Sequence, residues 1–121
     1  MNILRLCPGK KAEAITIPHT LEEMQKQVGG FIQAIYPFAD PVAIICNEEG
    51  KLLGLEPNRA IRDPDTGELV DIICGTCFIC GLGEDDFCSL TEEQIAYYCA
   101  LYQNPEIFLW NGSQIIVMQV V

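Results

Sequence analysis

Basic side chains are scarce in this sequence, and so are histidine and long apolar runs. Seven lysines and arginines stand against 17 aspartates and glutamates among 121 residues, which gives a formal net charge of -10. A chain this acidic repels the phosphates of DNA and RNA, so we expect no direct nucleic-acid binding. Apolar runs such as residues 42–46 are far too short to cross a bilayer, and no basic and apolar signal segment follows Met1. We therefore expect a soluble, cytoplasmic protein without membrane contact.

Histidine occurs once, at position 19, directly before the first predicted helix cap. A cysteine nucleophile needs a base, but a histidine at a helix entry more often contacts the start of the helix than a distant thiol. A helix-entry role for His19 is therefore favoured over a Cys–His pair. We assign no catalytic residue and expect a protein that is not an enzyme.

Seven cysteines are present, and without a signal segment they indicate a reducing compartment in which the thiols stay unpaired. Cys74, Cys77 and Cys80, followed by Cys88, have a spacing similar to the opening of an iron–sulfur motif. In a strand, however, residues 74 and 80 point to one face and residue 77 to the other, so one cluster cannot collect all three. Small buried thiols are favoured over metal ligands, and we expect no metal and no cofactor.

Half of the residues are apolar, enough to form a core, and the length suits one domain over residues 1–121. Apolar segments predict short strands at residues 2–7, 12–17, 31–36, 42–46, 51–55, 71–80, 108–110 and 113–121. We expect hairpin turns at residues 47–50 and at Asn111-Gly112, and a polar loop over residues 57–68. The segment 71–80 is nearly all apolar, which predicts a central strand covered on both faces.

Two amphipathic helices complete the pattern. The first begins after Thr20, has Glu23 where the carboxylate of a capping box reaches the Thr20 amide, and ends at Gly29-Gly30. The second opens within residues 89–94. Its apolar stripe consists of Ile95, Tyr98, Cys99 and Tyr102. Together these elements predict an α+β fold, a curved and mainly antiparallel sheet of short strands with both helices on one face.

Five short segments follow one another in a characteristic order. They are residues 28–32 (Val-Gly-Gly-Phe-Ile), 47–51 (Asn-Glu-Glu-Gly-Lys), 53–58 (Leu-Gly-Leu-Glu-Pro-Asn), the strand with Gly75-Thr76, and residues 89–94 (Ser-Leu-Thr-Glu-Glu-Gln). In this order the chain resembles a domain-of-unknown-function family that is widespread in phages, plasmids and conjugative elements of Gram-positive and gut bacteria. The resemblance runs from residue 1 to about residue 94. It implies a mobile-element setting but assigns no target and no functional residue.

Two sets of residues are candidates for binding. The first would serve a small ligand or nucleotide and comprises Gly29, Gly30, Asn47, Asn58, Arg59, Gly75 and Thr76. The glycine pair follows a helix, where carbonyls rather than amides are free, so helix termination is favoured over phosphate binding. Asn58 and Arg59 fit a turn or a ligand contact. The second set would contact a protein partner and comprises Glu48, Glu49, Glu84, Asp85 and Asp86, together with Glu92 and Glu93.

These patterns support two functional hypotheses. The first is an accessory protein of a phage, plasmid or integrated element that acts through a protein partner, with carboxylates standing in for DNA phosphates. A solvated, solubilising surface is the simpler explanation of the acidic excess. The alternative is a small-ligand or nucleotide-binding domain. The partner, the host and the oligomeric state stay open at this point.

Overall fold

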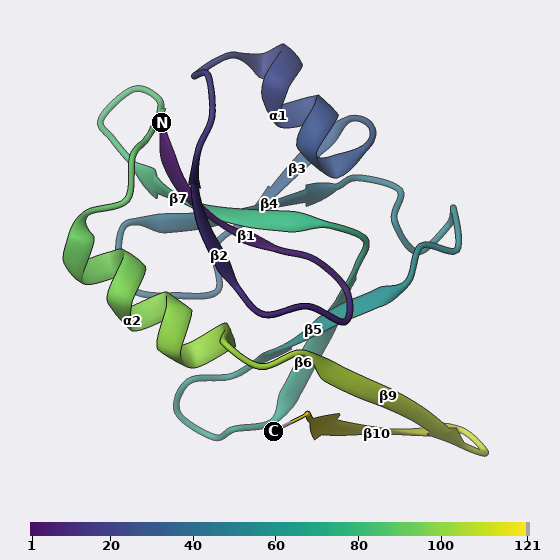
Figure 1. The fold of residues 1–121 in the computed structure, drawn as a ribbon. Coiled ribbons are helices and arrows are strands. Elements are labelled where there is room, and N and C mark those ends of the chain that lie inside the picture. The colour runs from purple at the N-terminus through teal and green to yellow at the C-terminus, as the bar shows by residue number, and fades with distance from the viewer. Residues whose placement is uncertain (121) are drawn as a thin grey trace.

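A six-stranded sheet forms the centre of the protein, as the computed structural model of residues 1–120 shows (Figure 1). The strands lie in the order β2 (Glu13–Thr16), β1 (Asn2–Leu6), β7 (Cys77–Leu82), β4 (Val42–Asn47) and β3 (Ile32–Ile35), and β8 (Phe87–Cys88) pairs with the end of β7. All of these pairs are antiparallel. With two helices, this arrangement confirms the expected α+β class. The predicted end of the last strand at Val121 lies outside the described residues.

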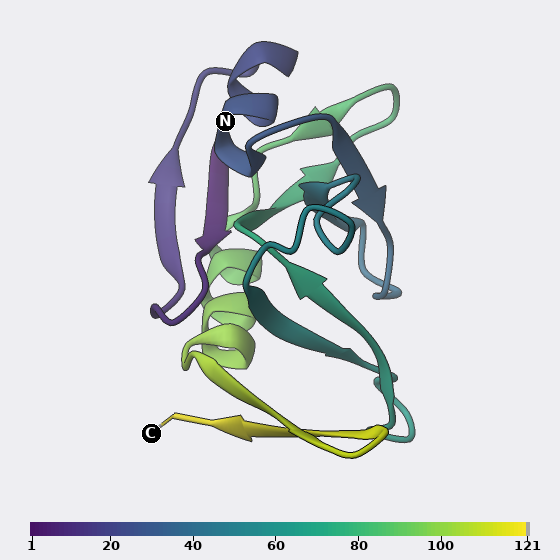
Figure 2. The same cartoon turned by 90° about the vertical axis from the view of Figure 1, so that its right-hand side faces the viewer.

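Two further ribbons lie beside the central sheet. One pairs β5 (Pro57–Arg62) with β6 (Leu69–Cys74), and the other pairs β9 (Glu106–Asn111) with β10 (Gln114–Gln119). Figure 2 shows β9 and β10 at the end of the molecule that is farthest from α1. Their turn consists of Gly112 and Ser113, one residue later than expected, because Asn111 pairs with Gln114.

The two helices, α1 (Leu21–Val28) and α2 (Glu92–Tyr102), pack on opposite faces of the sheet. Met24 and Val28 of α1 share a core with Ile3, Ile45 and Phe78, whereas Tyr98 and Tyr102 of α2 share another with Leu4, Ile44 and Ile79. Neighbouring residues of a strand point to opposite faces, so the expectation that both helices cover one face is wrong. Strands apolar at consecutive positions need a cover on both sides. No helix within residues 1–120 is long and apolar enough to cross a membrane.

The predicted strand over residues 71–80 is two strands. Gly75 has a φ of 88° and separates β6 from β7, so the chain changes from the outer ribbon to the central sheet at this residue. The expected central position is confirmed for β7, which pairs with both β1 and β4 and is buried from Cys77 to Gly81.

The predicted hairpin after β4 does not form. Residues 51–54 form turns instead of a strand, in which the Leu53 amide donates to the Glu49 carbonyl at 2.9 Å. A returning strand has no place there, because both edges of β4 are already occupied by β3 and β7. The polar loop expected over residues 57–68 is also wrong in its first half, which forms the largely buried β5.

Helix starts agree with the sequence pattern except for one carboxylate. The Thr20 hydroxyl accepts from the Glu23 amide at 3.1 Å, but the Thr20 amide donates to the Pro18 carbonyl and not to Glu23. At α2 the box is complete, because Thr91 and Gln94 exchange both bonds. The predicted stripe of α2 is confirmed, since all of its members pack in one core.

Candidate functional site

The turn after β4 brings Asn47 against the end of α1. Its side-chain Nδ2 donates to the Val28 carbonyl at 3.1 Å, and its Oδ1 accepts from the Glu49 amide at 2.8 Å. Gly29 takes the left-handed conformation that ends the helix, with a φ of 75°. Gly30 permits a close approach, because a Cβ at this position would lie 2.8 Å from Asn47 Nδ2. Three predicted ligand-binding residues therefore meet, and their contacts terminate the helix.

Gly75 and Thr76 line a hollow on the same side of the molecule. This hollow has a volume of about 440 Å³ and also contains Gly29, Lys26 and Leu55. Gly75 is required by close packing as well as by its positive φ, since a Cβ there would lie 2.7 Å from Leu55 Cδ1. Of the residues predicted to bind a small ligand, Gly29, Gly75 and Thr76 thus share one surface.

A second hollow, of about 280 Å³, lies beside the Asn47 turn. Asn47, Glu48 and Glu49 form one wall of it, and the ion pair of Lys51 with Asp71 forms part of the other. Glu48 and Glu49 are exposed there. Their charges are thus close to at least one lysine.

Asn58 and Arg59 are completely buried on β5. Asn58 Nδ2 donates to the carbonyls of Leu6 at 2.8 Å and Gly75 at 2.9 Å. The Arg59 guanidinium donates to the carbonyls of Lys10 at 2.6 Å and Tyr102 at 3.2 Å.

The same guanidinium bonds Asn58 Oδ1 at 2.8 Å, so the two side chains support each other. Burial lowers the pKa of Arg59, and the nearby carboxylate of Glu106 partly opposes this effect. Arg59 joins the turn between β1 and β2 to the end of α2, and every one of its nitrogens donates within the protein. Its geometry therefore favours a structural role over ligand binding. The sequence placed this pair in a loop, so their burial was missed.

The two groups of candidate carboxylates lie at opposite ends of the central sheet. Glu48 and Glu49 follow β4, whose end lies beside the start of β7, since Ile45 pairs with Phe78. Glu84, Asp85 and Asp86 follow the other end of β7. A six-residue strand is roughly 20 Å long, so no single contact of small size includes both groups. Figure 1 shows the two loops on opposite sides of the sheet.

Five exposed carboxylates gather around the loop after β7, and we call this set the acidic end. They are Glu84, Asp85 and Asp86 in the loop and Glu92 and Glu93 in the first turn of α2. Figure 1 places the loop and the start of α2 on the same side of the molecule. Within residues 1–120, the one contact of this set with a basic side chain joins Asp86 Oδ2 to His19 Nε2 at 3.3 Å.

Lysines lie toward the other end of β7. The turn carrying Lys10 and Lys11 follows β1, whose last residue pairs with Cys77 at the start of β7. Lys26 lines the hollow with Gly75, and Lys51 lies beside Glu49. The lysines are therefore concentrated toward one end of β7, where they lie near Glu48, Glu49 and Glu56, and within residues 1–120 no lysine or arginine forms an ion pair with the acidic end.

The cysteines of the Cys-x-x-Cys-x-x-Cys segment are not grouped. Cys74 belongs to β6, and Cys77 and Cys80 pack in the cores on opposite faces of β7. Burial raises the pKa of Cys77 far above its ordinary value and that of Cys80 to about 12. Both thiols are therefore protonated at neutral pH, as small core residues are expected to be.

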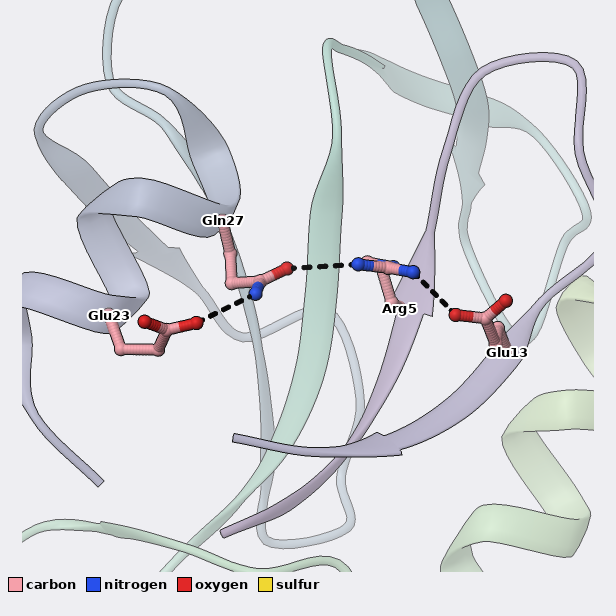
Figure 3. Close-up of polar contacts among 4 residues, drawn as sticks. All are labelled: Arg5, Glu13, Glu23 and Gln27. Carbon is pink, nitrogen blue, oxygen red and sulfur yellow. Dashed lines mark hydrogen bonds and ion pairs between the residues drawn. The ribbon is translucent and has the colours of Figure 1, made fainter. Parts of the chain in front are cut away.

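Arg5 makes a polar chain that sequence reasoning did not identify (Figure 3). Its guanidinium bonds Glu13 at 2.5 Å and Gln27 at 3.5 Å, and Gln27 in turn donates to Glu23 at 3.1 Å. The chain links β1 and β2 to α1. The contact of Arg5 with Gln27 spans 22 residues, so no local pattern indicates it.

Comparison with known proteins gives a family and no activity. No curated protein and no solved structure matches the chain. A family model matches residues 1–103, which include both helices and every strand up to β8. The chain therefore belongs to the family described as Domain of unknown function (DUF3846).

Proposed function

We propose that this protein is an accessory protein of a phage, plasmid or integrated element and that it binds a basic protein partner through the acidic end. The observation that carries the proposal is the separation of the acidic end from the lysines. Five carboxylates lie at one end of β7, while Lys10, Lys11, Lys26 and Lys51 lie toward the other. The ordered segments that resemble a mobile-element family support the setting.

The carboxylates of the acidic end are suited to mimicry of DNA. A protein that binds DNA presents lysine and arginine to a row of phosphates, and unpaired carboxylates offer the same sign of charge. Four of the five carboxylates of the acidic end have no ion pair within residues 1–120. The Glu48 and Glu49 pair is a weaker candidate, because Lys51 lies beside it.

The experiment compares two variants with the same change of charge. The tagged protein captures partners from a bacterial lysate at low salt, and the captured protein is purified. Its affinity is then measured for the wild type, for Glu84→Gln with Asp85→Asn and Asp86→Asn, and for the control Glu48→Gln with Glu49→Gln and Glu56→Gln. Glu56 is exposed and lines the hollow with Lys26 and Gly75, so it lies away from the acidic end, as Glu48 and Glu49 do.

We expect the first variant to bind about tenfold more weakly at low salt and with a smaller salt dependence, since exposed charges contribute up to about 1 kcal/mol each. The control should keep wild-type affinity. The side-chain amide at position 86 can still accept from the Phe87 backbone amide and can still bond the exposed His19 side chain, so the melting temperature should not fall. An equal loss in both variants, or no loss in either, would contradict a role for the acidic end.

A small-ligand site is the second candidate function. It is favoured by one observation: Gly29, Gly75 and Thr76 meet in a hollow whose charged side chains, within residues 1–120, are Lys26 and Glu56. A ligand of modest size that presents an anionic group to Lys26, on the side away from Glu56, fits this lining. Native mass spectrometry of the purified protein tests the idea, because a retained ligand adds a discrete mass that disappears in Lys26→Gln.

A further inference from the structure

The β9–β10 ribbon presents an apolar face to solvent. Its register places Ile107 opposite Met118 and Leu109 opposite Ile116, so these four side chains lie on the same face. Each of them is 44–46% exposed. We call this set the apolar ribbon face.

The other face of the ribbon is attached to the body of the protein. Phe108 and Val117 are half-buried there, and the Glu106 carboxylate accepts from the Ala60 amide of β5 at 2.9 Å. The ribbon is thus apolar on both sides. Strands of this kind are typical of a sheet that is covered on both faces, and here only one cover is present within residues 1–120.

The absence of charged residues from the ribbon indicates which kind of molecule covers the apolar ribbon face. Residues 107–120 contain no aspartate, glutamate, lysine or arginine, although the chain carries a net charge of -10. A charged partner would find no pairing group on the apolar ribbon face. Two copies of the chain, by contrast, can meet there without placing carboxylates against carboxylates.

We propose that two copies of this protein associate through the apolar ribbon face, related by a twofold axis. Such a contact uses the same patch on both copies and needs a self-complementary surface, which four uncharged aliphatic side chains provide. The ribbon lies beyond the residues of the family match, so this inference is independent of the proposed function.

The size of the patch predicts a weak dimer. Four side chains that are less than half exposed supply less than the roughly 800 Å² per partner that stable complexes bury. The dissociation constant should therefore lie in the micromolar range or above. The acidic bodies repel each other, so salt should strengthen this association, whereas it should weaken binding of a basic partner at the acidic end.

Sedimentation velocity over a wide range of protein concentration tests the proposal. The wild type should show reversible dimerisation. The dimer dissociation constant of Leu109→Glu should be about tenfold higher or more, because its carboxylate would be buried without a partner. Leu52→Glu is the matched control, since Leu52 is 87% exposed in the turn after β4. It should behave as the wild type.

Leu109→Lys separates loss of the interface from loss of folding. Each charged variant alone should be monomeric, and an equimolar mixture of Leu109→Glu and Leu109→Lys should regain association through opposite charges. A wild type that stays monomeric at the highest concentration overturns the proposal. Equal dimerisation of Leu109→Glu and Leu52→Glu, or a mixture that stays monomeric, also overturns it.

Discussion

At the scale of residues, adjacent glycines at the end of α1 have different roles. Gly29 is needed for its left-handed backbone, and within residues 1–120 no residue distant in sequence comes within 4 Å of the place where its Cβ would be. Gly30 has an ordinary backbone but leaves room for Asn47, which bonds the Val28 carbonyl. One glycine thus satisfies a backbone conformation and the other a tertiary contact.

Substitutions at the two glycines should separate these roles. Gly29→Ala should lower the free energy of unfolding by about 1 kcal/mol, through backbone strain alone. Gly30→Ala should cost about 1–3 kcal/mol in the wild type and clearly less in an Asn47→Ala background, because the clash is with the Asn47 side chain. Denaturant unfolding of the three single variants and of the double variant Gly30→Ala with Asn47→Ala measures this coupling. Additive effects of Gly30→Ala and Asn47→Ala would show that the close approach does not matter.

At the scale of elements, the same N-terminal signal gives two different caps. Both helices have a threonine followed three residues later by Glu or Gln, but only α2 closes the reciprocal box. In α1 the Glu23 carboxylate accepts from Gln27, whose oxygen is bonded by Arg5 (Figure 3). A contact from the neighbouring sheet thus directs Glu23 away from the helix start.

Amide hydrogen exchange should distinguish the caps. Gln94→Ala should speed exchange at the Thr91 amide and lower the free energy of unfolding by about 0.5–1 kcal/mol, because it removes the partner of that amide. Glu23→Ala should leave exchange at the Thr20 amide unchanged, since that amide is bonded to Pro18 at 3.0 Å. Faster exchange at Thr20 in Glu23→Ala would show that the box forms in solution.

At the scale of the whole molecule, the central sheet is buried on both faces, and thiols contribute to both cores. Cys77 packs on the side of α2 and Cys80 on the side of α1. Burial raises the pKa of both thiols, and it also raises the pKa of Tyr98, whose hydroxyl donates to Asp40 at 3.0 Å. The folded protein therefore holds protons that the unfolded chain releases at moderately alkaline pH.

This difference predicts a loss of stability at alkaline pH. The folded pKa of each thiol is raised, so its contribution is complete below the unfolded value of about 8.5 and decreases above it. Between pH 7 and pH 10 the loss should be about 2 kcal/mol for each thiol. Denaturant unfolding of the reduced protein at the two pH values measures it. The double variant Cys77→Ala, Cys80→Ala should lose less than the wild type, and an equal loss would refute the assignment.

What the sequence determined by itself is local. Both helices, the hairpin of β1 and β2 and the apolar segment that became β7 follow from residue spacing, caps and turns, which act over a few residues. Only the tertiary structure decided that Gly75 divides a continuous apolar segment, that Asn58 and Arg59 are buried, and that the acidic groups lie at opposite ends. These features depend on which strand edges are already occupied and on contacts between distant residues, such as Arg59 with Tyr102. Periodicity carries no information about such pairings, because they are chosen by the fold as a whole.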